Sequence, residues 1–150
     1  MSDPANFVAA SPRHALPFLF AGQAQKEFTF NETVARIDIL LHPAVAGELT
    51  LPPSDMEPGD CYLVATGGEG SFREKDGSLA LWDGQQWTFC QAREGMILRD
   101  NATGTLLVHD GAWQRLTAPV APSGGSIIDV EARAAIEELV GKLTAFGIFS

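Results

Sequence analysis

Two stretches of the chain, SLALWDGQQWTFC (78–90) and TLLVHDGAWQRL (105–116), share one pattern that restricts the possible fold more than any other feature. Each contains a short apolar run, an Asp-Gly pair, a tryptophan and a second short run. Asp-Gly between alternating apolar residues is a strong β-hairpin signal, because glycine adopts positive φ without penalty. The repeat predicts two antiparallel hairpins, although two copies do not establish a solenoid or a propeller.

The residue pattern from about residue 47 to 118 is typical of strands and turns. Pro52-Pro53 interrupts it, Pro58-Gly59 predicts a turn, and residues 61–65 predict a strand. The segment TGGEGSF (66–72) is predicted to be a flexible loop. It does not match a phosphate-binding loop, because it lacks the Gly-Lys-Ser/Thr ending and no helix follows it.

A helix is predicted over residues 31–41. Asn31 suits the N-cap, Glu32 favours the positive end of the helix dipole, and His42-Pro43 ends the helix because the residue before proline disfavours helical backbone. Phe30 and Ala35 are the natural pair for a hydrophobic staple.

One face of this predicted helix is apolar, and Arg36 and Asp38 are expected to face elsewhere. The apolar face is predicted to consist of Val34, Ile37, Leu40 and Leu41.

A second helix is predicted at the C-terminal end, with Asp129 as its N-cap and an end near Phe146. Gly147 fits the left-handed C′ position, and Ile148 can fold back against the helix. An apolar stripe with nearly heptad spacing runs along it: Ile136, Leu139, Val140, Leu143 and Phe146. The stripe either docks on the sheet of the same chain or packs against copies of itself, and the second alternative is slightly favoured.

These elements divide the chain into four parts and place it in the α+β class, as a small antiparallel hairpin sheet with an N-terminal helix and a C-terminal amphipathic helix. Residues 1–17 form a proline-containing arm that is either disordered or pinned onto a neighbouring subunit. Residues 18–118 form the helix and hairpin domain, 119–126 a linker, and 127–150 the C-terminal helix.

Charge and composition exclude several classes of partner. The 150 residues carry a formal net charge of −9, and the 10 Lys and Arg residues are scattered, which argues against nucleic acid and anionic membranes. No secretory signal and no apolar run of about 20 residues, the length that crosses a bilayer, is visible in the sequence. Cys61 and Cys90 are expected to be buried thiols rather than a disulfide or a metal site.

The sequence offers no pattern that supports an enzyme, a metal site or a cofactor. His14, His42 and His109 lack partners at metal-ligand spacing, and Ser54 and Ser71 lack the context of a nucleophile elbow. The carboxylate pair 137–138 is expected on a solvated helix face.

The tryptophans allow two interpretations. Trp82 and Trp87 flank one predicted turn, while His109 and Trp113 flank the other, so each pair is expected to meet across its hairpin. Such aromatic residues can anchor the core of a small sheet, which is favoured, or stack on sugar rings in a glycan-binding surface.

The stretch LPFLFAGQAQKEFTFNETVARIDILL (16–41) also resembles the signature of a phage-associated domain family from alphaproteobacterial prophages. Members read close to LP-L-x-x-GQAQKE-x-T-x-NEA-x-x-x-LD-x-LL. The segments GDCYLVA, WDGQQW and HDGAW are similar to the hairpins of this family, and residues 129–149 to its helical tail. Phe30 stands where the family often has histidine and Thr33 where it often has alanine, which weakens the idea of a histidine site.

The resemblance implies no enzymatic activity. Such proteins occur in tail fibres and spikes of phages and gene transfer agents, at the base of a structure that touches capsular polysaccharide. Members often have long C-terminal extensions, which the present sequence lacks, and this favours an assembly module. The expected partners are further copies of the chain in a ring or trimer, capsid or tail proteins, a separate fibre protein and, in the alternative function, host polysaccharide.

We therefore expect a virion component that is assembled in the bacterial cytoplasm and released by lysis, as the base or adaptor of a head spike or tail fibre. The alternative is a carbohydrate-binding module that contacts cell-surface glycan through Trp82, Trp87 and Trp113. A glycan-degrading enzyme is the weakest hypothesis, because no suitable acid/base pair is visible. The family signature itself is expected to brace the first helix against the hairpins or a neighbouring subunit, through Gln23, Gln25, Lys26, Glu27 and Asn31.

Overall fold

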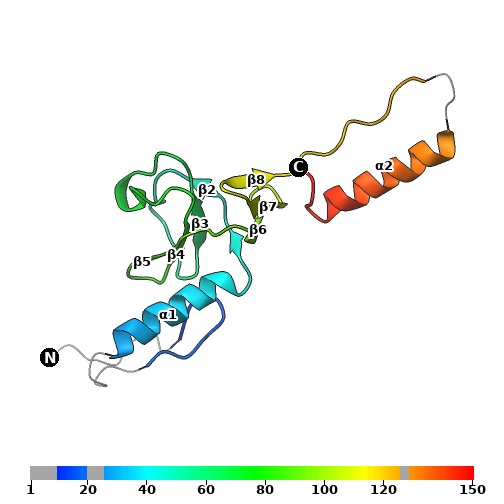
Figure 1. Cartoon of the computed structure of the whole chain (residues 1–150). Coiled ribbons are helices and arrows are strands. Elements are labelled where there is room, and N and C mark those ends of the chain that lie inside the picture. The colour runs from blue at the N-terminus through cyan, green and yellow to red at the C-terminus, as the bar shows by residue number, and fades with distance from the viewer. Residues whose placement is uncertain (1–9, 20–25, 126–128) are drawn as a thin grey trace.

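The computed structural model describes residues 10–19, 26–125 and 129–150, and within them the chain folds into two helices and two small sheets (Figure 1). This arrangement confirms the α+β class predicted from the sequence. The described part contains two four-stranded sheets instead of one, and each sheet has one parallel pair beside its antiparallel pairs.

The first sheet has the strand order β2-β3-β4-β5 and the second the order β1-β6-β7-β8. The first consists of β2 (Glu48–Leu49), β3 (Cys61–Val64), β4 (Leu79–Trp82) and β5 (Trp87–Cys90). The second consists of β1 (Ala44–Val45), β6 (Ile97–Asp100), β7 (Thr105–His109) and β8 (Trp113–Arg115). The short strands β1 and β2 are neighbours in sequence but belong to different sheets, so this segment links the two layers.

The two predicted hairpins are confirmed. In β4–β5 Trp82 pairs with Trp87, and in β7–β8 His109 pairs with Trp113. The Asp83 carboxylate accepts the N–H groups of Gln85 and Gln86 and so closes the first turn. This local bond explains why Asp-Gly is a reliable turn signal here.

The main core lies between the two sheets and receives one helix residue, Ile39. Its other members come from alternate positions of five strands, as expected where one face of each strand is buried: Val45, Cys61, Leu63, Leu79, Leu81, Leu98 and Leu107. A smaller cluster of Val64, Phe72 and Ala80 lies on the opposite face of the β2–β5 sheet. Both faces of that sheet are therefore covered.

The prediction that TGGEGSF is simply a flexible loop is wrong. Its last residues form the short 3₁₀ helix η2 (Gly70–Phe72), and Phe72 is fully buried. The Phe72 ring meets the rings of Trp87 and Phe89 edge-on, with centroids 5.1 and 6.1 Å away. The loop is thus pinned by one aromatic side chain, a long-range contact that its glycine-rich composition does not reveal.

The first helix, α1 (Lys26–Leu40), begins five residues before the predicted Asn31 start and ends, as predicted, before His42-Pro43. Asn31 lies inside the helix and is not its N-cap. The staple between Phe30 and Ala35 is also wrong, because both residues are helical. The N-cap prediction failed because the Asn31 side chain bonds to a distant segment of the chain, as described below.

The buried face of α1 also differs from the predicted stripe. It consists of Val34, Ala35, Asp38 and Ile39, whereas Ile37, Leu40 and Leu41 are exposed. Asp38 was expected to face away from the protein, yet it is fully buried. A buried carboxylate is tolerated where hydrogen-bond donors surround it, and these donors come from the N-terminal segment.

Residues 10–19 lie against α1 of the same chain. The N–H groups of Arg13 and His14 donate to the Asp38 carboxylate at 2.9 and 2.8 Å, and His14 Nδ1 lies 3.0 Å from it. The Arg13 guanidinium donates to the carbonyl groups of Ile39 and His42 at the end of α1. These carbonyls have no partner within the helix, so Arg13 acts as a C-terminal cap.

An ion pair between the buried Asp100 and the solvent-facing Arg115 connects strands of both sheets. Arg115 Nη2 donates to Asp100 at 2.7 Å, and Nη1 lies 3.3 Å from Glu48. Asp100 is buried on β6 and Arg115 lies on β8, so the pair joins two strands of one sheet. Glu48 extends the link to β2 in the other sheet.

The second helix, α2 (Val130–Ala145), forms as predicted. The Asp129 side chain accepts the Ala132 N–H, and Gly147 adopts φ 76°. Ile148 N–H donates to Leu143 O and Gly147 N–H to Thr144 O, which is the Schellman arrangement. Neither helix in the described part is long and apolar enough to cross a membrane.

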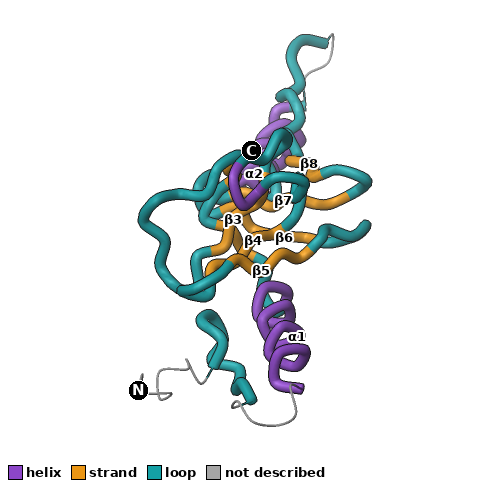
Figure 2. The backbone as a smooth tube through the Cα atoms, turned by 90° about the vertical axis from the view of Figure 1, so that its left-hand side faces the viewer, coloured by secondary structure: helices purple, strands orange, loops and turns teal. Residues whose placement is uncertain are grey.

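The last four residues attach α2 to the sheets. Leu106 N–H donates to Gly147 O, and Ser150 N–H donates to Leu116 O. A Cβ on residue 147 would collide with the Gly104 carbonyl, so glycine is required by space as well as by φ. α1 and α2 lie at opposite ends of the sheet region, and α2 extends away from it beside the linker (Figures 1 and 2).

Candidate functional site

The apolar stripe of α2 is open to solvent. No residue of α2 is buried, and the side chains of Ile136, Leu139 and Phe146 are 46%, 57% and 73% exposed. Val140 and Leu143 are half-buried. The stripe does not dock on the chain's own sheets, which was one of the two alternatives. Whether copies of the chain cover it stays a prediction.

α2 is attached to the sheets through the residues that follow it, and it contacts the linker. The Arg133 guanidinium donates to the carbonyl groups of Pro122 and Gly124, so the linker runs along the helix. Lys142 pairs with Glu138 one turn earlier, on the exposed surface. An isolated helix of this length is marginal in water, and amphipathic helices gain most of their stability by burying the apolar face. The stripe is therefore suited to contact another protein surface.

α1 presents a second exposed apolar surface on the side away from the sheets. Phe30, Ile37, Leu40 and Leu41 are between 42% and 47% exposed. Their spacing along the helix places Phe30, Ile37 and Leu41 close to one line. Because α1 and α2 lie at opposite ends of the sheet region, the two apolar surfaces are well separated (Figure 2).

Of the five predicted brace residues, the structure describes the side chain of one. Asn31 Oδ1 accepts the Leu19 N–H at 2.9 Å, and Nδ2 donates to the Leu19 carbonyl at 3.2 Å. Gln23 and Gln25 lie outside the described residues. Lys26 and Glu27 begin α1, and their side chains lie outside the described part. The bracing role of the segment as a whole stays a prediction.

The tryptophans meet their partners across the hairpins as predicted, but the two hairpins use them differently. The rings of Trp82 and Trp87 are 5.3 Å apart, and Trp87 also packs against Phe72 and Tyr62. Trp113 instead packs against the main core and donates its indole N–H to the Gly77 carbonyl at 2.8 Å. The structure therefore does not bring the three predicted tryptophans together on one surface.

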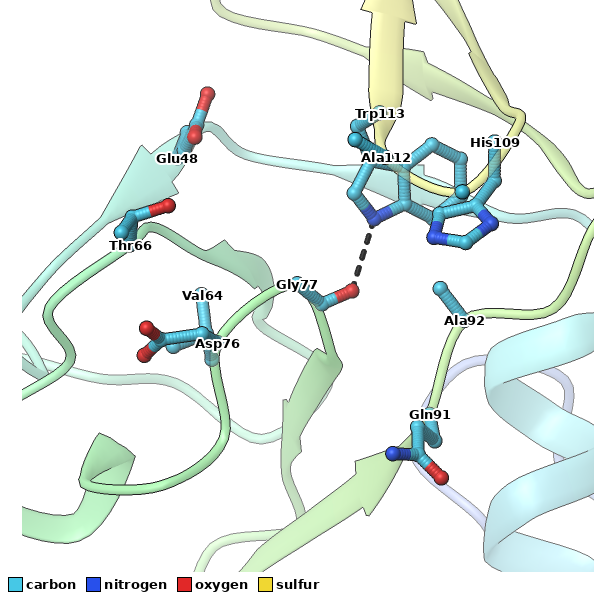
Figure 3. Close-up of a pocket in the computed structure, with 11 residues that line it drawn as sticks. Glu48, Val64, Thr66, Asp76, Gly77, Gln91, Ala92, His109, Ala112 and Trp113 are labelled. Carbon is cyan, nitrogen blue, oxygen red and sulfur yellow. Dashed lines mark hydrogen bonds between the residues drawn. The ribbon is translucent and has the colours of Figure 1, made fainter.

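Trp113 lines a cleft of about 450 Å³ between the β7–β8 turn and the loop that precedes β4 (Figure 3). Glu48, Thr66 and Asp76 lie on one side of the Gly77–Trp113 hydrogen bond, and His109 and Gln91 lie on the other. His109 Nδ1 is buried and has no hydrogen-bond partner among the described residues. An unpaired buried polar atom is uncommon in native proteins and calls for an explanation.

Two titratable groups have environments that bear on the chemistry of the chain. The N–H groups of Gly67 and Gly68 lower the pKa of the exposed Asp76 carboxyl, which they hold at 2.9 and 3.0 Å. Burial raises the pKa of the Cys61 thiol to about 12, so it stays protonated at neutral pH. Cys61 is buried, Cys90 is half-buried, and both are free thiols. The described residues hold no group of three His, Cys, Asp or Glu side chains placed to bind a metal ion.

Sequence reasoning missed the Asp38–Arg13 lock, the Asp100–Arg115 pair and the polar groups of the cleft. Each depends on residues far apart in the chain. One pattern in the sequence could have indicated that Asp38 is buried. A lone carboxylate between apolar helix positions is compatible with a buried carboxylate that accepts hydrogen bonds from the protein. No local signal identifies Glu48 or Gln91 as neighbours of Trp113.

The fold and these surfaces define a class: a small α+β protein of two layered four-stranded sheets that carries an apolar helix surface at each end. The family model described as "Protein of unknown function (DUF2793)" matches residues 30–114, more than half of the chain, and the chain belongs to this family. The match begins after the GQAQKE run and ends before α2. No curated protein and no solved structure matches the chain.

Proposed function

We propose that the protein is a structural virion component, the base or adaptor of a head spike or tail fibre in a phage or gene transfer agent. In this role it supports attachment of the particle to capsular polysaccharide on the host cell. The observation that carries the proposal is α2, a helix capped at both ends whose apolar stripe remains outside the core of its own chain.

Self-association through α2 is the simplest use of this stripe. Ile136, Leu139 and Leu143 recur at the spacing by which identical helices share a seam, and the acidic residues 131, 137 and 138 lie off the seam. Identical copies related by closed symmetry would bury the stripe in every subunit. We expect a trimer or a ring.

The second apolar surface, on α1, supports the role of an adaptor. An adaptor needs one surface for its own copies and another for the particle or the fibre. Phe30, Ile37 and Leu41 on α1 lie at the opposite end of the sheet region from α2, so both surfaces can be occupied together. The resemblance of residues 16–41 to the phage-associated signature supports placing such an adaptor in a virion, where it would be assembled in the cytoplasm and released by lysis.

The virion role is tested by electron microscopy of particles produced with and without the protein. We expect one appendage, spike or fibre, to vanish without it and to return when the purified wild-type protein is added to the deficient particles. A variant with Ile37→Glu on α1 should assemble with itself but fail to restore the appendage, with Glu32→Gln on the solvated side of α1 as the matched control. Particles that keep every appendage, or that never take up the purified protein, would refute the role.

A second candidate function is a carbohydrate-binding module that itself contacts cell-surface glycan. The cleft beside Trp113 is the observation that favours it, whereas Trp82 and Trp87 are engaged with each other and with the Phe72 cluster. Titration of host polysaccharide, followed by intrinsic tryptophan fluorescence, tests this function. A saturable change supports it, and the absence of any change and of any binding excludes it.

A further inference from the structure

Contacts within the chain hold Trp113 in place at the cleft. Its indole N–H is committed to the Gly77 carbonyl, and its ring meets the His109 ring at 5.1 Å and 75°. The hydrogen bond joins residues far apart in the chain, and the β7–β8 pairing holds the backbone of both aromatic residues. The aromatic wall is therefore fixed before any ligand arrives, a condition that favours binding because little order is lost.

The cleft also contains polar groups with unused hydrogen-bonding capacity. Each oxygen of Asp76 accepts one backbone N–H, which leaves a further lone pair on each. Glu48 meets Arg115 through one oxygen, 3.3 Å from the guanidinium, and no described residue bonds to its other oxygen. Thr66 and Gln91 add a hydroxyl and an amide.

The charge of the cleft narrows the chemistry of its ligand. Among the described residues, no Lys or Arg lines it and two carboxylates do, so phosphate and other anions are disfavoured. A cation is also a poor match, because Arg115 already pairs with Glu48 and two N–H groups already surround the Asp76 charge. Hydroxyl groups suit both carboxylates as donors, and they suit the Gln91 amide because they donate and accept.

We propose that this cleft binds a neutral, hydroxyl-rich ligand, one or two units of an uncharged saccharide, with the apolar face of a sugar ring against Trp113. Hydroxyl groups of the sugar bond to Asp76 and Glu48 on one side and to Gln91 on the other. The volume of about 450 Å³ falls within the usual range of small-molecule sites. The inference rests on the binding-module function and is independent of the adaptor role.

The test uses the full chain labelled with 5-fluorotryptophan, which gives separate ¹⁹F NMR signals for Trp82, Trp87 and Trp113. Glucose, N-acetylglucosamine and short dextran oligosaccharides are titrated to about 50 mM, a range that covers weak affinities. We expect the Trp113 signal to shift saturably, while Trp82 and Trp87 serve as internal controls. Inorganic phosphate and tetramethylammonium are the anionic and cationic probes, and neither should compete.

The matched variants are Gln91→Ala in the cleft and Gln86→Ala in the β4–β5 turn, both at exposed positions. Gln91→Ala removes the amide and keeps Trp113, so saccharide affinity should fall about three- to tenfold, as expected for one hydrogen bond. Gln86→Ala should leave it unchanged. Asp76→Asn, on the other side of the cleft, should give an independent decrease, because an uncharged amide oxygen accepts a weaker hydrogen bond than a carboxylate.

Four outcomes overturn the proposal: no neutral saccharide shifts Trp113, Trp82 or Trp87 shifts equally, neither cleft variant weakens binding, or phosphate or tetramethylammonium binds more tightly than every saccharide. Binding of host polysaccharide without a shift at Trp113 would retain the binding-module function and reject this cleft. Loss of self-association has no bearing on the result, so failure of the adaptor role is recognised separately.

Discussion

The two helices have nearly the same length, 15 residues in α1 and 16 in α2, but different kinds of contact hold them. α1 buries Ile39 in the core between the sheets and surrounds its Asp38 carboxylate with donors from residues 10–19. α2 buries none of its residues and is specified by its own ends, through Asp129 and Gly147. Tertiary contacts therefore position α1, whereas local capping defines α2.

This difference identifies α2 as the part of the molecule whose apolar surface is not buried within its own chain. α2 is capped at both ends and attached to a sheet, yet the residues of its apolar stripe stay exposed or half-buried. The stripe is therefore suited to contact another molecule. α1 is anchored within its own chain by Ile39 and Asp38, and its outer apolar surface is exposed. The following predictions test this contrast between the helices, in order of decreasing effect.

The largest contrast is between Ile39→Ala and Leu139→Ala. Ile39 is fully buried, so truncation should lower the free energy of unfolding by about 2–5 kcal/mol. Leu139 is exposed, so the same truncation in the dissociated protein should change it by less than about 0.5 kcal/mol. Urea unfolding at low protein concentration, followed by circular dichroism, measures both. Equal losses would remove the distinction between the helices.

The next effect concerns Asp38. Replacing Asp38 by Ala leaves the N–H groups of Arg13 and His14 without their acceptor and should destabilise the protein by about 2–3 kcal/mol. Limited proteolysis should then cut within residues 10–19 before the sheets are attacked. Asp76→Ala is the control, because that carboxyl is exposed and far from the arm. An arm that stays protected in Asp38→Ala would refute the lock.

Acid should weaken the same lock. Burial alone raises the pKa of Asp38, but hydrogen bonds from Ser11, Arg13 and His14 outweigh it and leave the pKa lowered. The carboxylate therefore stabilises the fold above its unfolded pKa of about 3.9, and this contribution is lost as the pH falls from there through the lower folded value. Unfolding free energies measured across that window should decline in wild type and decline less in Asp38→Ala.

A smaller effect is expected when two glycines of the C-terminal region are replaced by alanine, and the two replacements should change stability in opposite directions. Gly147→Ala forces a side chain into a left-handed position and against Gly104, and should destabilise the attachment of α2 by about 1–2 kcal/mol. Gly141→Ala lies mid-helix, where a Cβ meets nothing, and should stabilise α2 by about 0.5–1 kcal/mol. Hydrogen exchange of the Ser150 amide and the α2 amides reports both. Matching changes of the same sign would contradict this account of the helix end.

The smallest effect is that of Asn31→Ala. It removes two hydrogen bonds to Leu19 from a half-buried position, so we expect a loss of about 1 kcal/mol. Thr33→Ala, on the exposed side of the same helix, is the control. Thermal unfolding measures the difference. No change in Asn31→Ala would leave the predicted brace residues without a stabilising contact among the described residues.

What the sequence could predict depends on the range of the interactions. The hairpins and α2 followed from local signals, since Asp83, Asp129 and Gly147 each bond within a few residues. The start of α1 was misplaced because Asn31 bonds to Leu19 rather than capping its own helix. Asp38 was assigned to the wrong face because its donors lie about 25 residues earlier in the chain, a separation that helical periodicity does not detect.

The candidate sites also differ in whether local signals or long-range contacts define them. The apolar stripe of α2 was predictable residue by residue, because helical spacing alone defines it. The cleft was predictable only through Trp113 and its pairing with His109. Glu48, Asp76 and Gln91 reach it from three other segments, and the parallel pairings of β1 with β6 and β2 with β3 have no local signature.

The central claim, that copies of the chain cover the stripe of α2, is tested most directly by sedimentation velocity of the wild type and Leu139→Glu, with Ala134→Glu as the control on the opposite face of the helix. We predict a trimer or ring for the wild type and for Ala134→Glu. Leu139→Glu should be a monomer with an unchanged circular dichroism spectrum. A wild-type protein that stays monomeric at high concentration, or a Leu139→Glu variant that assembles equally well, would contradict the claim.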